Sequence, residues 1–435
     1  MRRLVLLAIV GAALWGAPGA FAAGWCGTGE SATDLPDVVT GPQIHAIYAI
    51  PSDGTDSFAA GAPLLADDIA SITTWWQGQD PTRVPRFDNA SFNGTTCTDI
   101  SFVRLPDPAS KWADMGAGAA FALISSDLFG LGFDNPYKKY YVYFDGPSVE
   151  ADVCGTGAGT FESGPSYAVV WLGGCSDVPT DAIGAHELLH ALGALPAGAP
   201  NACTAKDNPL GAYADPGHPC DSPTDVLYPV TTGAPLSSLV LDYDHDDYYA
   251  HSGSWIDIQD SPWLHLLDAP QFPIAVAIDG AGTVESDQPG LDCTSTCTTQ
   301  WDQGAQVTLS ALATRTTHFV SWHGACTGGT PTCSVTADAA QPVSAVFGPA
   351  RISVTVSTTG QGHVLCAPAC SSRFVAGTSL TLRAVSAKGW RFVRWSGACK
   401  GTRPTCIPTT NYAFAAHASF AKLRAKPKKK KPTER

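Results

Sequence analysis

The residues best able to do chemistry are His186, Glu187 and His190, which lie in one H-E-x-x-H segment. On a helix, the two histidines lie one turn apart on the same face, so both imidazoles can bind one metal ion. Glu187 points about 100° around the helix from His186, where its carboxylate can reach a water molecule. The pattern is typical of zinc sites that hydrolyse peptide bonds, with the glutamate as general base.

The surrounding sequence predicts the elements that position this segment. The apolar run Tyr167–Leu172 indicates a buried strand. Pro179–Asp181 offers residues that can cap a helix, and Gly193 falls where a helix would end in a left-handed conformation. The alternative interpretation is an amphipathic helix that carries two histidines incidentally.

Four further segments of the first 270 residues predict a mixed α+β domain over residues 24–270. A sheet with long helices packed against it follows from the apolar patterns. The expected strands are Ile44–Ile50, Ser101–Leu105 and Lys139–Phe144, and the expected helix is Leu64–Trp76.

The H-E-x-x-H-x-x-G pattern that ends at Gly193 resembles the metzincin zinc peptidases. The resemblance implies a metzincin-like catalytic domain with one catalytic Zn²⁺. In that family the third zinc ligand lies three residues after the glycine, where this chain has Pro196, which cannot bind a metal. Residues 25–27, Trp-Cys-Gly, also resemble the start of a family of secreted bacterial proteins with a metzincin-type core.

The segment Asp225–Pro229 resembles the metzincin Met-turn, with Leu227 at the methionine position. A Met-to-Leu change conserves volume and keeps an apolar floor beneath the metal. Tyr228 and Pro229 resemble the matrixin form of this turn, which implies that Leu227, Tyr228 and Pro229 form the wall of the S1′ pocket.

The third zinc ligand is expected to be His218, because a catalytic zinc usually takes three protein ligands. Leishmanolysin-like metzincins also insert a long loop before this histidine. We hypothesise a disulfide between Cys203 and Cys220, which would hold His218 near the end of the helix. No Glu occurs between Glu187 and Glu285, so a downstream glutamate is excluded. The alternatives that stay open are Asp221 or Asp225, then His245, His251 or no third ligand.

The last third of the chain duplicates itself at an offset of 73 residues. Alternating apolar and polar residues between glycine-rich turns predict two small antiparallel β modules, over 271–349 and 350–421. Each copy has four cysteines, for which local disulfides are favoured, namely Cys293–Cys297 and Cys326–Cys333, and correspondingly Cys366–Cys370 and Cys399–Cys406. Residues 272–421 resemble the bacterial internalin B-repeats, which implies a spacer or attachment role at a cell surface or matrix.

The N-terminal residues predict a signal peptide, and the C-terminal residues form a basic segment. Residues 1–23 have the charged start, apolar middle and A-x-A end of a secretory signal peptide, and 14 Cys favour disulfides in an exported protein. No later apolar run is long enough to span a membrane. The net charge is −13 although residues 422–435 form a basic tail expected to be disordered. An acidic body argues against nucleic acid as the main partner.

Two further groups invite a functional interpretation. Cys26 could block the zinc as a thiolate, although the even number of cysteines favours a disulfide. Asp242, Asp244, Asp246 and Asp247 suggest a structural Ca²⁺ site, although they lack the Gly and final Glu of an EF-hand loop.

Together the motifs predict a secreted zinc endopeptidase that acts on protein or peptide substrates. One alternative is a non-catalytic adhesion protein that keeps a metzincin-like fold. The other is an enzyme that hydrolyses a different amide, such as a peptidoglycan cross-link.

Overall fold

The structure is a computed structural model that describes residues 24–27, 31–195, 197–231 and 233–424. The chain divides into two compact units. The first runs to Phe272 and includes residues 288–291 and 299–305, and the second contains the remaining residues from Pro273 onward. The predicted signal peptide, Pro196 and residues 425–435 of the predicted tail lie outside the described residues.

The first unit is built on a five-stranded sheet with the order β5-β1-β6-β8-β7. Its first four strands run parallel, and the edge strand β7 runs antiparallel to β8. The bounds are β1 (Gln43–Ile50), β5 (Ile100–Arg104), β6 (Lys138–Phe144), β7 (Gly155–Ala158) and β8 (Ser166–Trp171). The sequence predicted four of these strands within two residues, and it missed β7.

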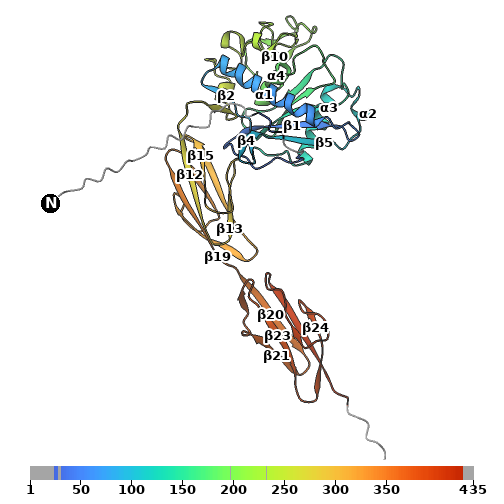
Figure 1. Ribbon diagram of the computed structural model, residues 1–435, viewed down its shortest axis with the longest axis vertical. Coiled ribbons are helices and arrows are strands. Elements are labelled where there is room, and N and C mark those ends of the chain that lie inside the picture. Colours follow the sequence, from blue (N-terminus) through green and yellow to red (C-terminus); the bar gives the residue numbers. More distant parts are fainter. Residues whose placement is uncertain (1–23, 28–30, 196, 232, 425–435) are drawn as a thin grey trace, which may run out of the picture. The chain divides into compact units, whose positions relative to one another are not determined.

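Helices cover both faces of this sheet, which explains why its strands are continuous apolar runs. Ile44, Tyr48 and Ile50 of β1 face one core with α1 (Phe58–Gln79) and α4 (Thr180–Leu192). Ile47 and Ala49 face the opposite core with α2 (Ala109–Trp112) and α3 (Ala117–Gly130). Figure 1 shows α1 and α4 next to each other in the first unit. The unit is therefore mixed, as expected, but its mostly parallel sheet between helix layers is an α/β arrangement.

Short elements connect the main ones. Three pairs of strands form small two-stranded sheets, and three short 3₁₀ helices lie between residues 236 and 260. The pairs are β2 (Arg83–Pro85) with β11 (Leu264–Leu266), β3 (Asn89–Phe92) with β4 (Thr95–Thr98), and β9 (Ala202–Cys203) with β10 (Asp215–Pro219). The 3₁₀ helices are η1 (Leu236–Ser238), η2 (Tyr243–His245) and η3 (Ile258–Asp260).

The helix α4 ends as predicted but begins differently. Gly193 has a φ of 89°, the left-handed conformation that glycine adopts without a Cβ penalty. At the other end, Pro179 occupies the N-cap position and no side chain caps the helix. Asp181 instead accepts a hydrogen bond from the Ser71 hydroxyl of α1 at 2.6 Å. The predicted capping residue therefore joins two helices.

A buried ionic network lies at the start of the parallel strands. The His45 imidazole is fully buried, and its Nδ1 lies 2.8 Å from Oδ2 of Asp88. The Lys138 ammonium lies 2.6 Å from Asp34, 2.8 Å from Asp37 and 2.9 Å from Asp88. Burial alone would lower the pKa of His45, but the carboxylates of Asp88 and Asp34 raise it to about 9.

The second unit contains two β modules, as the duplication predicted. Within each module, however, the first and last strands pair in parallel: β12 with β19, and β20 with β26. The first module has β12 (Gln271–Asp279), β13 (Gly282–Ser286), β14 (Asp292–Cys293), β15 (Cys297–Asp302), β16 (Gln306–Ala313), β17 (Thr317–Gly324), β18 (Thr332–Thr336) and β19 (Gln341–Pro349). The second has β20 (Arg351–Thr359), β21 (Gly362–Ala367), β22 (Arg373–Val375), β23 (Thr381–Ser386), β24 (Trp390–Gly397), β25 (Thr405–Cys406) and β26 (Phe414–Lys422).

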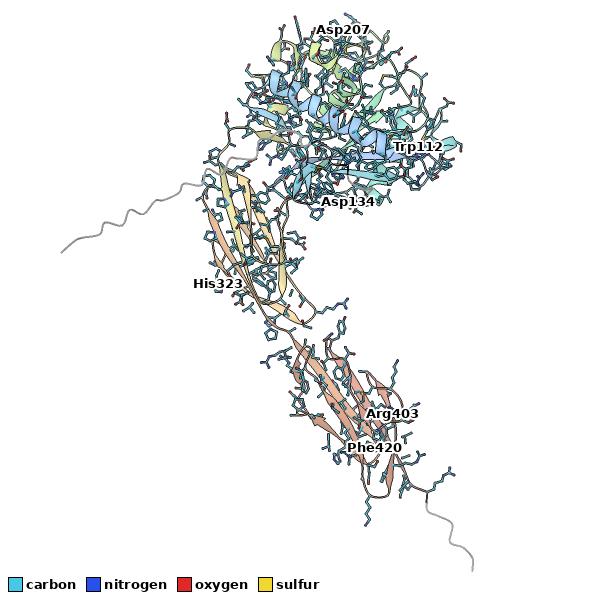
Figure 2. The ribbon with its side chains drawn as sticks, viewed as in Figure 1. Trp112, Asp134, Asp207, His323, Arg403 and Phe420 are labelled. Carbon is cyan, nitrogen blue, oxygen red and sulfur yellow. A yellow bond between two sulfur atoms is a disulfide. The ribbon has the colours of Figure 1, made fainter. Side chains whose placement is uncertain are left out.

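The two modules repeat the same small core. A Cβ at Gly282 would stand 2.5 Å from the Phe347 ring, and one at Gly362 would stand 2.5 Å from the Phe420 ring. Phe420, labelled in Figure 2, is 6% exposed. Lys422 closes β26, so the second module continues one residue into the segment predicted as tail.

Disulfides staple both units. The modules contain Cys293–Cys297, Cys326–Cys333, Cys366–Cys370 and Cys399–Cys406. The first unit contains Cys26–Cys97, Cys154–Cys175 and Cys203–Cys220. Among the described residues, no helix has the length and apolar character needed to cross a membrane.

Candidate metal centre

The helix α4 presents its two histidines from a buried position. It packs against β7, β8 and α1. At Gly184 the helix lies so close to the sheet that a Cβ there would stand 1.8 Å from the hydroxyl oxygen of Tyr141 in β6. His186 is 7% exposed. Because the i, i+4 spacing puts His190 on the same face, both rings point toward one place beside the sheet edge.

His218 of β10 completes a cluster with these two histidines. The Nε2 atoms of His186 and His190 are 3.2 Å apart, and the Nε2 atom of His218 is 3.2 Å and 3.3 Å from them. Three nitrogens bound tetrahedrally at zinc–nitrogen distances of about 2.0–2.1 Å would lie about 3.3–3.4 Å from one another. The cluster therefore has the dimensions of a three-histidine zinc site.

The second nitrogens of two rings lie beside oxygen atoms. His186 Nδ1 lies 2.7 Å from the Val226 carbonyl oxygen. His218 Nδ1 lies 2.9 Å from Oδ2 of Asp215, an ion-pair distance at which the two groups do not form a hydrogen bond. The Val226 carbonyl favours a proton on His186 Nδ1, so the Nε2 atom of His186 turns a lone pair into the cluster. Lone pairs this close repel one another unless a cation lies between them. The donor set therefore fits a metal ion.

The protonation of the cluster agrees with this arrangement. Burial first, and then the neighbouring His218, lower the pKa of His186 to about 3. Burial and the other two rings hold the pKa of His190 well below its ordinary value. Both rings are therefore neutral at physiological pH, which is the form that binds metals.

A loop closed by a disulfide places His218 next to α4. Cys203 of β9 is bonded to Cys220, two residues after His218, and β9 pairs with β10. The sequence did not single out Asp215, whose carboxylate lies 2.9 Å from Nδ1 of His218. In the sequence, Asp215 differs from other aspartates only in lying three residues before His218, and this spacing is too common to identify it.

The alternative ligands lie elsewhere. In the described part of the chain, the group of mutually close ligand atoms around α4 contains only His186, His190 and His218. Asp225 Oδ1 accepts the Leu227 N–H at 2.7 Å, and its Oδ2 accepts the Tyr243 N–H at 2.8 Å. Its carboxylate thus shapes the turn beneath the cluster. His251 stacks on Trp255, with ring centroids 4.7 Å apart.

A small pocket of about 20 Å³ lies beside His186. Tyr228 lines it together with Ala182 and Val226. Leu227 does not, because it is fully buried in the core beneath the turn, and Pro229 is not among the lining residues. Of the three residues expected in the S1′ wall, the structure therefore places only Tyr228 at the pocket.

Glu187 is held under the glycine-rich edge strand β7. Burial raises the pKa of its carboxyl to about 8, while a hydrogen bond from the Gly157 N–H acts in the opposite direction. A Cβ at Gly155 would stand 2.5 Å from Oε1 of Glu187, and one at Gly157 would stand 2.2 Å from its backbone oxygen. The strand can approach the helix only because these residues lack side chains.

One sequence interpretation is confirmed here and another needs correction. Cys26 forms a disulfide with Cys97, as the even number of cysteines favoured, so its thiolate is not available to block a metal. Asp242 accepts hydrogen bonds from the backbone N–H groups of residues 247, 248 and 249, so it is not open to a calcium ion. The carboxylates that converge are instead those of Asp221, Asp246 and Asp247.

A further ligand-type group surrounds His45 and contains Asp34, Asp88 and Asp99. Here the imidazole is shared between Asp88 and the Ser101 hydroxyl at 2.8 and 2.9 Å, and the Lys138 ammonium forms ion pairs with Asp34 and Asp88. The group is therefore a buried ion network.

Comparisons with known proteins match the back of the chain. The family described as "Divergent InlB B-repeat domain" matches residues 275–351 and 352–425. No curated protein matches the chain. Among solved structures, wild-type OgpA from Akkermansia muciniphila has 12% identity and a TM-score of 0.24, covering 83% of this chain and 94% of its own. Catalytically inactive OgpA in complex with an O-glycopeptide substrate has 11% identity and a TM-score of 0.24, with 83% and 93% covered.

The major pilin from Streptococcus pyogenes has 6% identity and a TM-score of 0.17, covering 36% of this chain and 100% of its own. All these TM-scores are low, so these similarities do not indicate a function for this chain.

Proposed function

We propose that this chain is a secreted zinc-dependent endopeptidase of metzincin type. The observation that carries the proposal is the triangle of Nε2 atoms of His186, His190 and His218, 3.2–3.3 Å on each side. Its dimensions suit tetrahedral zinc, and the His186 ring is oriented by the Val226 carbonyl at Nδ1. The disulfides support export to an oxidising compartment.

The chemistry of the site divides between the metal and Glu187. His186, His190 and His218 would hold a zinc ion, which would supply polarisation of the substrate carbonyl and a lowered pKa of water. A cation bound by the neighbouring histidines would favour the ionised form of the Glu187 carboxyl. In that form Glu187 would accept a proton from the attacking water and return it to the amine that leaves when the peptide bond breaks. Its burial under β7 excludes bulk water from the carboxyl.

The edge strand β7 favours an extended peptide as the substrate. Within the described sheet, β7 pairs only with β8, so no strand covers its other edge, although the Gly157 N–H is bonded to Glu187 and the Gly155 carbonyl accepts the Thr156 hydroxyl. A peptide that adds to this edge would form main-chain hydrogen bonds beside Glu187 and α4. Tyr228, which lies at the pocket beside His186, would contact one of its side chains.

Zinc content and peptidase activity test the proposal in the full chain. Glu187→Gln should retain about one zinc per chain and lose activity, whereas His218→Ala should lose both. His251→Ala, a histidine outside the cluster, is the matched control and should lose neither. A Glu187→Gln protein with undiminished turnover, or a wild-type chain that binds no zinc, would refute the proposal.

The two B-repeat-like modules favour an additional attachment or spacer role at a surface or matrix. A chain that attaches but does not cleave would keep these modules and lack zinc. The metal analysis therefore also separates the enzyme from a non-catalytic adhesion protein.

A further inference from the structure

Three carboxylates meet on the first unit, away from the histidine cluster. Asp221 follows the disulfide-bonded Cys220, and Asp246 and Asp247 follow η2. One oxygen from each lies within 4.8 Å of the other two. Over the residues that the structure describes, no lysine, arginine or histidine forms a salt bridge with any of the three. Three negative charges are thus gathered without a protein cation to offset them.

A second observation shows that one of these carboxylates lacks a partner. Asp247 is fully buried, and its Oδ1 accepts the Asn201 N–H at 2.8 Å. Its Oδ2 has neither solvent contact nor a hydrogen-bond partner. A buried carboxylate oxygen without a partner is strongly unfavourable, so native proteins rarely leave one unsatisfied. The Oδ2 atom of Asp247, which has no partner, therefore indicates a positively charged ligand.

We propose that Asp221, Asp246 and Asp247 bind a structural calcium ion. The donors are all oxygens, which hard cations prefer, and three carboxylates provide the charge that Ca²⁺ sites use. Asp221 and Asp246 are exposed, so water can fill the remaining positions of a six- to eight-coordinate shell. The site lies outside the proposed zinc centre and stands independently of the peptidase proposal.

The ion would join two segments that together support His218. Asn201 donates its backbone N–H to Asp247 and its side-chain amide to Asp246 at 3.1 Å, and its carbonyl accepts the Cys220 N–H at 2.9 Å. Asp221 lies three residues after His218 on the same loop. A cation shared by Asp221 and Asp247 would therefore restrict the loop that presents this imidazole.

Terbium luminescence tests the site directly, because Tb³⁺ replaces Ca²⁺ in oxygen sites and is sensitised by a nearby indole. Trp255 donates its Nε1–H to the Asp247 carbonyl oxygen at 2.7 Å, so an indole lies next to the carboxylates. In the zinc-loaded full chain, excitation of tryptophan should yield Tb³⁺ emission that added Ca²⁺ abolishes. Asp221→Asn should weaken Tb³⁺ and Ca²⁺ binding by about tenfold or more, because it removes one of three charged ligands.

Asp244→Asn is the matched control. Asp244 is an exposed aspartate of the same acidic run, lies outside the trio and has a φ of 63° that asparagine tolerates. The Ca²⁺ affinity of the Asp244→Asn protein should equal that of the wild type. Added Ca²⁺ should also raise the Tm of the wild type and of Asp244→Asn, but not of Asp221→Asn.

Three outcomes would overturn the proposal: no sensitised emission, equal Ca²⁺ affinity in Asp221→Asn, or displacement of Tb³⁺ by Mg²⁺ but not by Ca²⁺. Zinc content and peptidase activity of the same preparations keep the two proposals apart. Calcium binding without activity would contradict only the peptidase proposal.

Discussion

Single residues decide whether the histidine triangle can hold a metal. Asp215 Oδ2 lies 2.9 Å from Nδ1 of His218, and a carboxylate at this position would raise the basicity of the imidazole and favour it as a metal ligand. Asp215→Asn should therefore weaken zinc affinity by about 10–100-fold, as measured by competition with a chromophoric chelator. Asp207→Asn, a substitution at an exposed position of the same loop, should leave the affinity unchanged. Equal affinities in the two variants would mean that Asp215 does not support the site.

The ligating residues were predictable from the sequence to different degrees. His186 and His190 follow from their i, i+4 spacing. His218 could be inferred only through the loop that Cys203 and Cys220 close. Asp215 could not be found, because its role depends on where β10 places it relative to the helix.

At the scale of elements, the contact between β7 and α4 depends on glycine. A Cβ at Gly157 would stand 2.2 Å from the Glu187 carbonyl oxygen, a backbone atom that cannot move aside cheaply. Gly157→Ala should therefore lower the free energy of unfolding by about 1–3 kcal/mol and reduce activity. Gly78→Ala in α1 meets nothing within 4 Å and should raise stability by about 0.5–1 kcal/mol. Urea unfolding of both variants measures the difference, and a Gly157→Ala protein as stable as wild type would contradict the packing argument.

The network around His45 makes stability depend on pH. The folded-state pKa of about 9 exceeds the ordinary value of 6.5, so the stabilisation is complete below pH 6.5 and is lost as the pH rises toward 9. The charged groups that face this ring are Asp34, Asp88, Asp99 and Lys138. The loss should reach about 3 kcal/mol on the basis of 1.36 kcal/mol per pH unit.

Urea unfolding between pH 6 and pH 9 measures this dependence. His45→Gln is the control, because it cannot titrate and should flatten the profile while lowering stability throughout. A wild-type profile that stays flat over this range would show that His45 is not charged in the folded protein.

The elements themselves were largely predictable, and the exceptions have physical reasons. Apolar runs identified β1, β5, β6 and β8, because strands buried on both faces are continuously hydrophobic. The edge strand β7 escaped prediction because Gly-Thr-Gly-Ala has low strand propensity and is selected by its close contact with α4. The parallel pairs in the modules escaped it because the alternation of side chains does not reveal strand direction.

At the scale of the whole molecule, one chain combines a unit that carries the histidine cluster with modules of a different kind. The 73-residue duplication identified both modules from the sequence alone, since matching cysteines, glycines and aromatics fix the register. The matches to the B-repeat family cover these modules and leave the first unit to be interpreted from its own geometry.

The parallel pairing of β12 with β19, and of β20 with β26, has a mechanical consequence. Six residue pairs join each couple, and the chain enters along one strand and leaves along its parallel neighbour. Tension between the two ends of a module would slide these strands past each other and load all their backbone hydrogen bonds together, rather than peel them apart one by one. Stretching single chains by force spectroscopy should therefore give high, discrete rupture peaks for the modules, and a smooth low-force extension would contradict this. Each module is thus suited to act as a tether that withstands pulling.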